Sequence, residues 1–158
     1  MRKQIRVLEY YQERSDEVIQ LSIEKRYEIS FLFRKILVPV DGSENSFKAL
    51  DLALDFAKRY GSKIYCAYVK RVNEDDKEIR ELIEKKSLEK KIHIDYETLT
   101  YNPGESSVSS ELIRYINEQG FDAVIIGARG RTLSEDINIG STALSIVINA
   151  PVTVIVVR

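Results

Sequence analysis

Short apolar runs alternate with amphipathic segments from residue 34 to the C-terminus, and this alternation restricts the folds open to the chain. The apolar runs predict strands at 34–40, 63–69, 93–99, 121–126 and 152–157, and apolar residues at helical spacing predict helices at 44–60, 73–91, 106–118 and 141–149. Continuous apolar runs are typical of parallel strands covered on both faces. The sequence therefore predicts an α/β fold, an open five-stranded parallel sheet with helices on both faces and strand order 3-2-1-4-5.

A loop with glycines at both ends follows the fourth apolar run. Gly127 and Gly130 stand at its start, and nine residues separate Gly130 from Gly140. Glycine lacks Cβ and tolerates positive φ, so the backbone can come close to a ligand. Gly140 also opens a predicted helix, where Gly140, Ser141 and Thr142 would offer amide and hydroxyl donors to an anion. The loop is therefore a candidate phosphate site.

The spacing of these glycines differs from the two common phosphate loops. A P-loop needs a lysine and then serine or threonine directly after its last glycine, and a dinucleotide fingerprint has its glycines beside the first strand. The spacing here, with KILVPVDGSENS near the first strand and APVTVIVV at the end, resembles the universal stress protein family. The resemblance covers residues 33–158. It implies a Rossmann-like fold of the adenine-nucleotide alpha-hydrolase type and an adenine nucleotide as ligand.

The predicted topology brings distant segments to one crevice. Asp41 and Gly127 end the first and fourth strands, which flank the point where strand order reverses and where ligands bind. Asp41 could accept hydrogen bonds from ribose hydroxyls, and the alternative that it only caps the following helix stays open. The resemblance implies ligand contacts by Pro39, Val40 and Asp41, adenine contact by the backbone of Val69 with Ile126 lining the base, Gly127 at the ribose, and Gly130, Gly140, Ser141 and Thr142 at the phosphates. Arg129 and Arg131 could add positive charge or simply be solvated.

The acidic residues in the middle of the glycine loop affect which nucleotide, ATP or AMP, the site would accept. Glu135 and Asp136 would repel a triphosphate unless a divalent ion such as Mg²⁺ stood between them. ATP ranks first, with or without Mg²⁺, and AMP is the alternative. No set of nucleophile, base and cations for phosphoryl transfer stands out, so no catalytic residue is assigned. Regulation by bound nucleotide, with at most slow ATP hydrolysis, fits better than an enzyme.

The last predicted strand indicates that the protein pairs with a second copy of itself. Residues 152–157 lie at a sheet edge, and an uncovered apolar edge pairs readily with another strand. We expect a homodimer through Val152, Val154 and Val156, and the resemblance implies the same interface. A nucleotide-free dimeric scaffold of the same fold is the second hypothesis. The intact glycine pattern speaks against it, and the downstream protein partner is not specified by the sequence.

Composition narrows the remaining possibilities. A net charge of −1 gives no argument for binding nucleic acid or an anionic membrane. No apolar run approaches the roughly 20 residues of a membrane span, and the charged N-terminus is unlike a secretory signal, so we expect a cytoplasmic protein. Cys66 is the only cysteine and should be buried. His93, the only histidine, should take a surface or half-buried strand position and bind no metal. Residues 1–32 show both helical and strand-like spacing, and we expect an arm packed on the domain or a neighbour, with disorder as the alternative.

Overall fold

The computed structural model describes residues 33–131 and 138–158 and confirms the predicted sheet. Five parallel strands stand in the order β3-β2-β1-β4-β5. The strands are β1 (Lys35–Pro39), β2 (Lys63–Arg71), β3 (Ile94–Tyr101), β4 (Ala123–Gly127) and β5 (Thr153–Val157), and the helices are α2 (Glu44–Tyr60), α3 (Lys77–Lys90), α4 (Val108–Gln119) and α5 (Ser141–Asn149). The proposed N-terminal arm, residues 1–32, lies outside the described residues.

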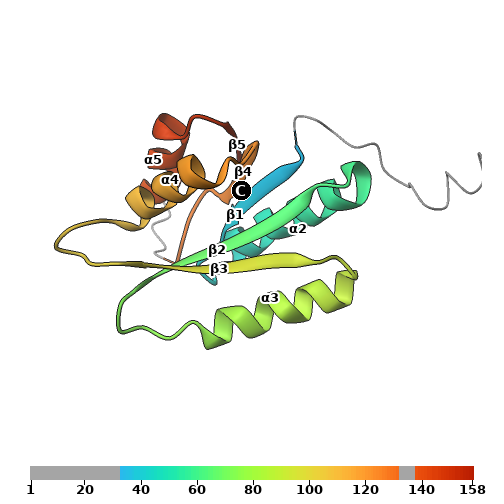
Figure 1. The fold of residues 1–158 in the computed structure, drawn as a ribbon, viewed down its shortest axis with the longest axis horizontal. Helices are drawn as coiled ribbons and strands as arrows, with labels where there is room; N and C mark the ends of the chain where they lie inside the picture. Colours follow the sequence, from blue (N-terminus) through green and yellow to red (C-terminus); the bar gives the residue numbers. More distant parts are fainter. Residues whose placement is uncertain (1–32, 132–137) are drawn as a thin grey trace, which may run out of the picture.

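The helices cover the sheet in two layers (Figure 1). Alternate residues of a strand point to opposite faces, so β1 supplies both layers. Ile36 and Val38 pack in the cluster that contains the buried residues of α2 and α3, whereas Leu37 packs with α4 and α5. Strand β1, in the centre of the sheet, is therefore buried on both sides, as its continuous apolar sequence predicts.

Local signals fix the bounds of α2. Ser43 caps the helix by accepting a hydrogen bond from the amide of Ser46, and Gly61 ends it with φ at 68°. Both roles follow from residue type, because serine is a favoured N-cap and glycine takes the left-handed conformation at low cost. The predicted helix at 44–60 is confirmed.

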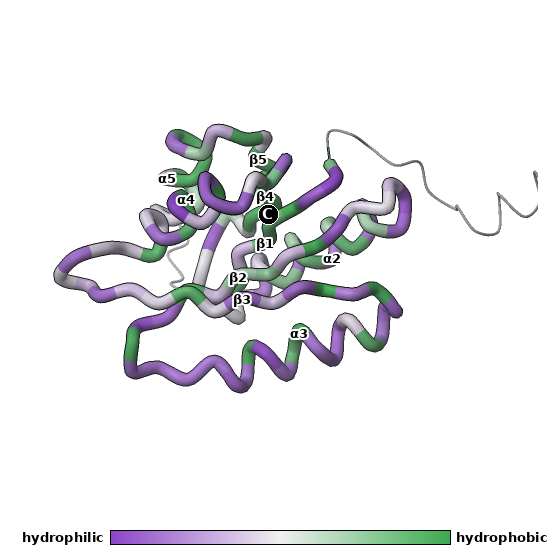
Figure 2. The backbone as a smooth tube through the Cα atoms, in the orientation of Figure 1, coloured by the Kyte–Doolittle hydropathy of each residue, from purple (hydrophilic) through white to green (hydrophobic). Residues whose placement is uncertain are grey.

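Helix α3 begins later than predicted, at Lys77 instead of residue 73. Figure 2 shows that most of it is hydrophilic. Ile79 and Ile83 are buried, but Leu82 is 40% and Leu88 78% exposed, so only one narrow stripe of the helix contacts the sheet. Strands β2 and β3 each run two residues beyond their predicted ends, and they pair as far as Arg71 and Tyr101.

The isolated cysteine and histidine lie as expected. Cys66 is fully buried, and burial raises the pKa of its thiol. His93 is exposed, and its Nε2 lies 3.1 Å from Oδ1 of Asp95. Within residues 33–131 and 138–158, no group of three or more His, Cys, Asp or Glu side chains is placed to hold a metal ion. No helix in the same ranges is long and apolar enough to cross a membrane.

Candidate functional site

A cavity of about 810 Å³ opens at the carboxyl ends of β1, β2 and β4, beside the start of α5. This is the crevice expected where strand order reverses. Every predicted contact residue lines it: Pro39, Val40, Asp41, Val69, Ile126, Gly127, Arg129, Gly130, Gly140, Ser141 and Thr142. Segments almost a hundred residues apart in the chain thus form one site.

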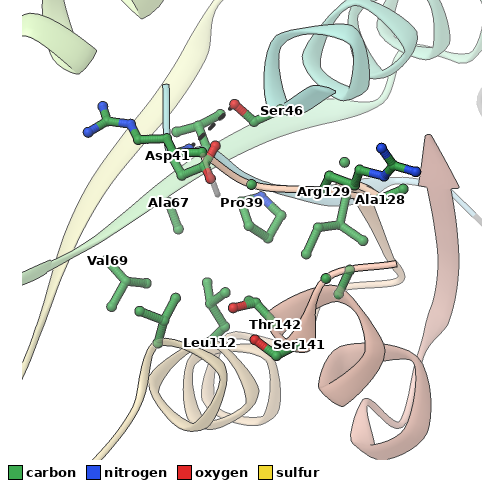
Figure 3. A pocket seen from close by; sticks show the side chains of 18 of the residues that line it. Pro39, Asp41, Ser46, Ala67, Val69, Leu112, Ala128, Arg129, Ser141 and Thr142 are labelled. Atoms are coloured by element: carbon green, nitrogen blue, oxygen red, sulfur yellow. Dashed lines mark hydrogen bonds between the residues drawn. The ribbon is translucent and has the colours of Figure 1, made fainter. Parts of the chain in front are cut away.

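The cavity changes character along its length. Figure 3 shows Asp41 on one side and the hydroxyls of Ser141 and Thr142 on the other, with Val69 and Leu112 beside the open space. The wall near β2 and α4 is apolar and includes Ala67, Val69, Val108, Leu112 and Ile126. An apolar slot next to hydrogen-bonding groups suits a ligand that has a flat base at one end and an anion at the other.

The start of α5 brings hydrogen-bond donors to the cavity wall, although Gly140 contributes differently from expectation. Gly140 is the N-cap, no side chain caps the first turn, and the Gly140 amide already donates to the carbonyl of Ala128 at 2.6 Å. The donors for an anion are therefore the amides and hydroxyls of Ser141 and Thr142, which follow Gly140 in the first turn. A Cβ at residue 140 would meet its nearest described neighbour, the Ala128 oxygen, at 3.5 Å, so no contact within residues 33–131 and 138–158 requires glycine there.

Gly127 has a structural reason to be glycine. A Cβ there would lie 2.7 Å from the carbonyl carbon of Asn45 and 2.9 Å from the amide nitrogen of Ser46, in the first turn of α2. The backbone of β4 and α2 could not approach so closely with a larger residue. Positive φ is not the reason, because the only described residues with positive φ are Gly42, Gly61, Lys91 and Gly120. Of the two properties of glycine, the missing Cβ is therefore the one that matters at residue 127.

Asp41 supports the start of α2 indirectly, through the N-cap residue Ser43, and its role toward a ribose stays a prediction. Its Oδ1 accepts hydrogen bonds from the amide of Ser43 at 3.0 Å and from the hydroxyl of Ser43 at 2.5 Å. Ser43 in turn caps α2. A Cβ on Gly130 would lie 2.7 Å from Asp41 Oδ2, so this second oxygen faces the glycine loop across the cavity rim. The carboxylate therefore supports the start of α2 through one oxygen only.

The two arginines of the loop lie apart from each other. Figure 3 shows the side chain of Arg129 extending away from the open space. The guanidinium of Arg131 lies over Gly42, so close that a Cβ on Gly42 would meet its Nη2 at 2.5 Å and Ile79 at 2.8 Å. Gly42 also has φ at 82°, which makes it a residue that the turn from β1 to α2 requires. The acidic residues Glu135 and Asp136 lie outside the described residues.

The sequence did not predict the lining residues at the ends of β2 and β3, which are Arg71, Glu74 and Tyr101. Arg71 Nε donates to the hydroxyl of Tyr101 at 3.4 Å, and the amide of Arg71 donates to Glu74 Oε2 at 3.0 Å. These residues line the cavity beyond Val69 because β2 and β3 continue past their predicted ends. The available signal was the strand period of two, which places Arg71 on the same face as Ala67 and Val69.

Comparison with known proteins agrees with this geometry. A sequence model of the Universal stress protein family matches residues 32–158. The chain belongs to the universal stress protein family. A universal stress protein of Methanocaldococcus jannaschii is 27% identical over 146 residues, which cover 80% of this chain and 83% of the relative.

Solved structures of the family share the fold. The universal stress protein from Archaeoglobus fulgidus in complex with dAMP has a TM-score of 0.58 and 20% identity, over 81% of this chain and all of that one. A universal stress protein in complex with cAMP has a TM-score of 0.64 and 18% identity, over 79% of this chain and 96% of that one. At such low identity the likeness concerns the fold alone.

Proposed function

We propose that this universal stress protein binds an adenine nucleotide in the cavity between β1, β4 and α5 and acts as a nucleotide-dependent regulatory module. The observation that carries the proposal is the set of groups around one open space. Val69 and Leu112 lie beside it, the Asp41 carboxylate stands on one side, and the hydroxyls of Ser141 and Thr142 stand on the other. The base would meet apolar side chains, the ribose the carboxylate, and the phosphate the donors at the start of α5.

The ligands of two relatives support the same class of molecule. One universal stress protein has been solved with cAMP and the Archaeoglobus fulgidus protein with dAMP, and both ligands consist of adenine, a sugar and a phosphate. For this chain we rank ATP first and AMP second. The volume of about 810 Å³ lies within the usual range of about 300–1,000 Å³ for small-molecule sites. Mg²⁺ would accompany the longer phosphate chain.

Regulation fits the cavity better than turnover. Phosphoryl transfer uses cations that neutralise the developing charge, and lysine often supplies one of them. The described lining residues include no lysine or histidine. Of the lining arginines, Arg129 extends away from the open space, Arg71 donates to Tyr101, and Arg131 lies over Gly42. We therefore assign no catalytic residue, and slow ATP hydrolysis is the most that we expect. The cytoplasmic location stays a prediction.

The deciding experiment is to denature the full-length protein as isolated and to identify the released small molecule by mass. ATP or AMP at near-stoichiometric yield would support the proposal and give the phosphate length. The stripped protein would then be titrated with ATP and AMP, each with and without Mg²⁺, by calorimetry. If no nucleotide is released and none binds on titration, the proposal fails, and the nucleotide-free scaffold becomes the better account.

We further propose that the protein is a homodimer that pairs through β5. This strand is the edge of the sheet next to β4, and Val154 and Val156 are only partly buried. The neighbouring helix α5 leaves Leu144, Val147 and Ile148 exposed, the last by 68%. Apolar surface next to an open edge is what a second copy would cover.

Light scattering after gel filtration tests the interface. Val156→Lys should give monomers, whereas Thr100→Lys, on the exposed surface of the opposite edge strand β3, should leave the dimer intact. Because Val156 also packs on the core, circular dichroism must show that the monomeric variant is folded. A folded Val156→Lys dimer would place the interface elsewhere.

A further inference from the structure

The carboxylate of Asp41 is fixed through one of its two oxygens. Oδ1 accepts two hydrogen bonds, from the amide and from the hydroxyl of Ser43, at 3.0 and 2.5 Å. A carboxylate oxygen has two lone pairs, so these donors occupy Oδ1. Oδ2 is the oxygen with acceptor capacity for a ligand, and hydrogen bonds to an ionised acceptor are the stronger kind.

Ser43 is itself held in place by the start of α2. Its Oγ accepts from the amide of Ser46 at 3.2 Å, and the Ser46 hydroxyl donates to the Ser43 carbonyl at 2.8 Å. The single hydroxyl hydrogen of Ser43 has two acceptors within reach, Asp41 at 2.5 Å and the Arg129 carbonyl at 3.5 Å, and the shorter contact is the stronger. The N-cap of α2 thereby sets the direction of the Asp41 carboxylate.

Gly130 keeps the other side of the carboxylate clear. A Cβ on Gly130 would lie 2.7 Å from Asp41 Oδ2, closer than real Cβ contacts come. Since Gly130 has no positive φ, the backbone itself would accept alanine. The absence of a side chain at residue 130 is therefore needed for Oδ2 to stand where it does. With a Cβ at residue 130, the far end of the Asp41 side chain would have to move from the place in which Ser43 holds it.

We propose that Ser43 and Gly130 are positioning residues that present Asp41 Oδ2 to the ribose, and that the site consequently prefers ribonucleotides to deoxyribonucleotides. This inference rests on the proposed nucleotide function and deepens it. The vicinal hydroxyls of a ribose can both donate to one charged oxygen, whereas a deoxyribose supplies one donor fewer. Because a relative has been solved with dAMP, we expect the preference to be a difference of affinity and not complete exclusion.

Calorimetric titration of the full-length protein with AMP, 2′-deoxy-AMP and 3′-deoxy-AMP tests this preference. Wild type should bind AMP about tenfold to a hundredfold more tightly than at least one deoxy analogue, the factor expected for a hydrogen bond to a charged group. Asp41→Ala should bring the ratio close to one. Ser43→Ala and Gly130→Ala should each lower it several-fold, and Ser43→Thr, which keeps the hydroxyl, should restore it.

A matched variant separates positioning from helix capping. Ser107 caps α4 as Ser43 caps α2, by accepting from the amide of Ser110 at 3.2 Å. Ser107→Ala should therefore lower stability as Ser43→Ala does but leave the ratio of affinities unchanged. An unchanged ratio in both Ser43→Ala and Gly130→Ala would overturn the inference.

The wild-type titrations distinguish a failure of ribose selection from a failure of the nucleotide function. Equal affinity for AMP and both deoxy analogues would refute ribose selection while the nucleotide function stood. Absence of binding by all three, together with ATP, would refute the nucleotide function and the inference with it.

Discussion

The replacement of Gly127 by alanine should destabilise the domain, because β4 and α2 meet there through backbone atoms. The new Cβ would stand 2.7, 2.8 and 2.9 Å from the Asn45 carbon, the Asn45 oxygen and the Ser46 nitrogen. Carbon atoms pack best at about 3.5–4.0 Å, so the first turn of α2 would have to retreat by roughly 0.8 Å. That turn carries Ser46, which is buried, and it begins the helix that covers β1 and β4.

The magnitude follows from two opposed effects. Overpacking of this kind costs about 1–3 kcal/mol, and contact with backbone favours the upper end because backbone cannot change rotamer. The loss of glycine from the unfolded chain returns about 0.4–1 kcal/mol. The net loss should be about 2 kcal/mol, which lowers the melting temperature of a chain of this size by roughly 4–8 °C.

Urea unfolding followed by circular dichroism measures the effect. Gly104→Ala is the matched control, since the nearest atom to its Cβ is Asn102 Oδ1 at 3.8 Å, and it should be at least as stable as wild type. Equal midpoints for Gly127→Ala and Gly104→Ala would refute the reasoning and return Gly127 to a purely ligand-related role.

Three other predictions concern Gly140, Cys66 and Asp76. The nearest described atom to a Cβ at residue 140 is 3.5 Å away, so Gly140→Ala should keep wild-type stability. It should still lower the ratio of ATP affinity to adenosine affinity at least several-fold, and an unchanged ratio by calorimetry would refute the placement of phosphates at this end of the cavity. Cys66, buried and with a raised pKa, should react with iodoacetamide at pH 8 only after unfolding in urea, and labelling of the native protein would contradict its burial. Hydrogen bonds from Thr98, Tyr96 and Arg80 hold the pKa of Asp76 below its usual value. The ionised carboxylate therefore stabilises the fold fully when the pH is above its unfolded pKa of about 3.9. This stabilisation is lost as the pH falls through the lower pKa of the folded state. Asp76→Asn should therefore lower the free energy of unfolding at pH 7 by an amount that shrinks below about pH 4, and a pH-independent difference would exclude the linkage.

The sheet and most helix bounds could be predicted because their signals are local. Ser43 and Gly61 delimit α2 by residue type, and the buried run of β1 identifies a central parallel strand. The start of α3 could not be predicted, because Asp76 directs its side chain to Tyr96 and Thr98 of β3 instead of capping its own helix. The extra length of β2 and β3 also depends on pairing between them, which neither strand shows alone.

The loop glycines show why a site can be located from sequence and still be misread in detail. The spacing of Gly127, Gly130 and Gly140 located the cavity, yet the three glycines differ in what stands where their Cβ would be. Gly127 makes room for the backbone of α2 and Gly130 for the carboxylate of Asp41, whereas Gly140 has no such close neighbour among the described residues. A sequence records that Cβ is absent but not which atom occupies its place. Of the three glycines, Gly140 therefore carries the clearest signal of a ligand, because no contact inside the described structure accounts for it.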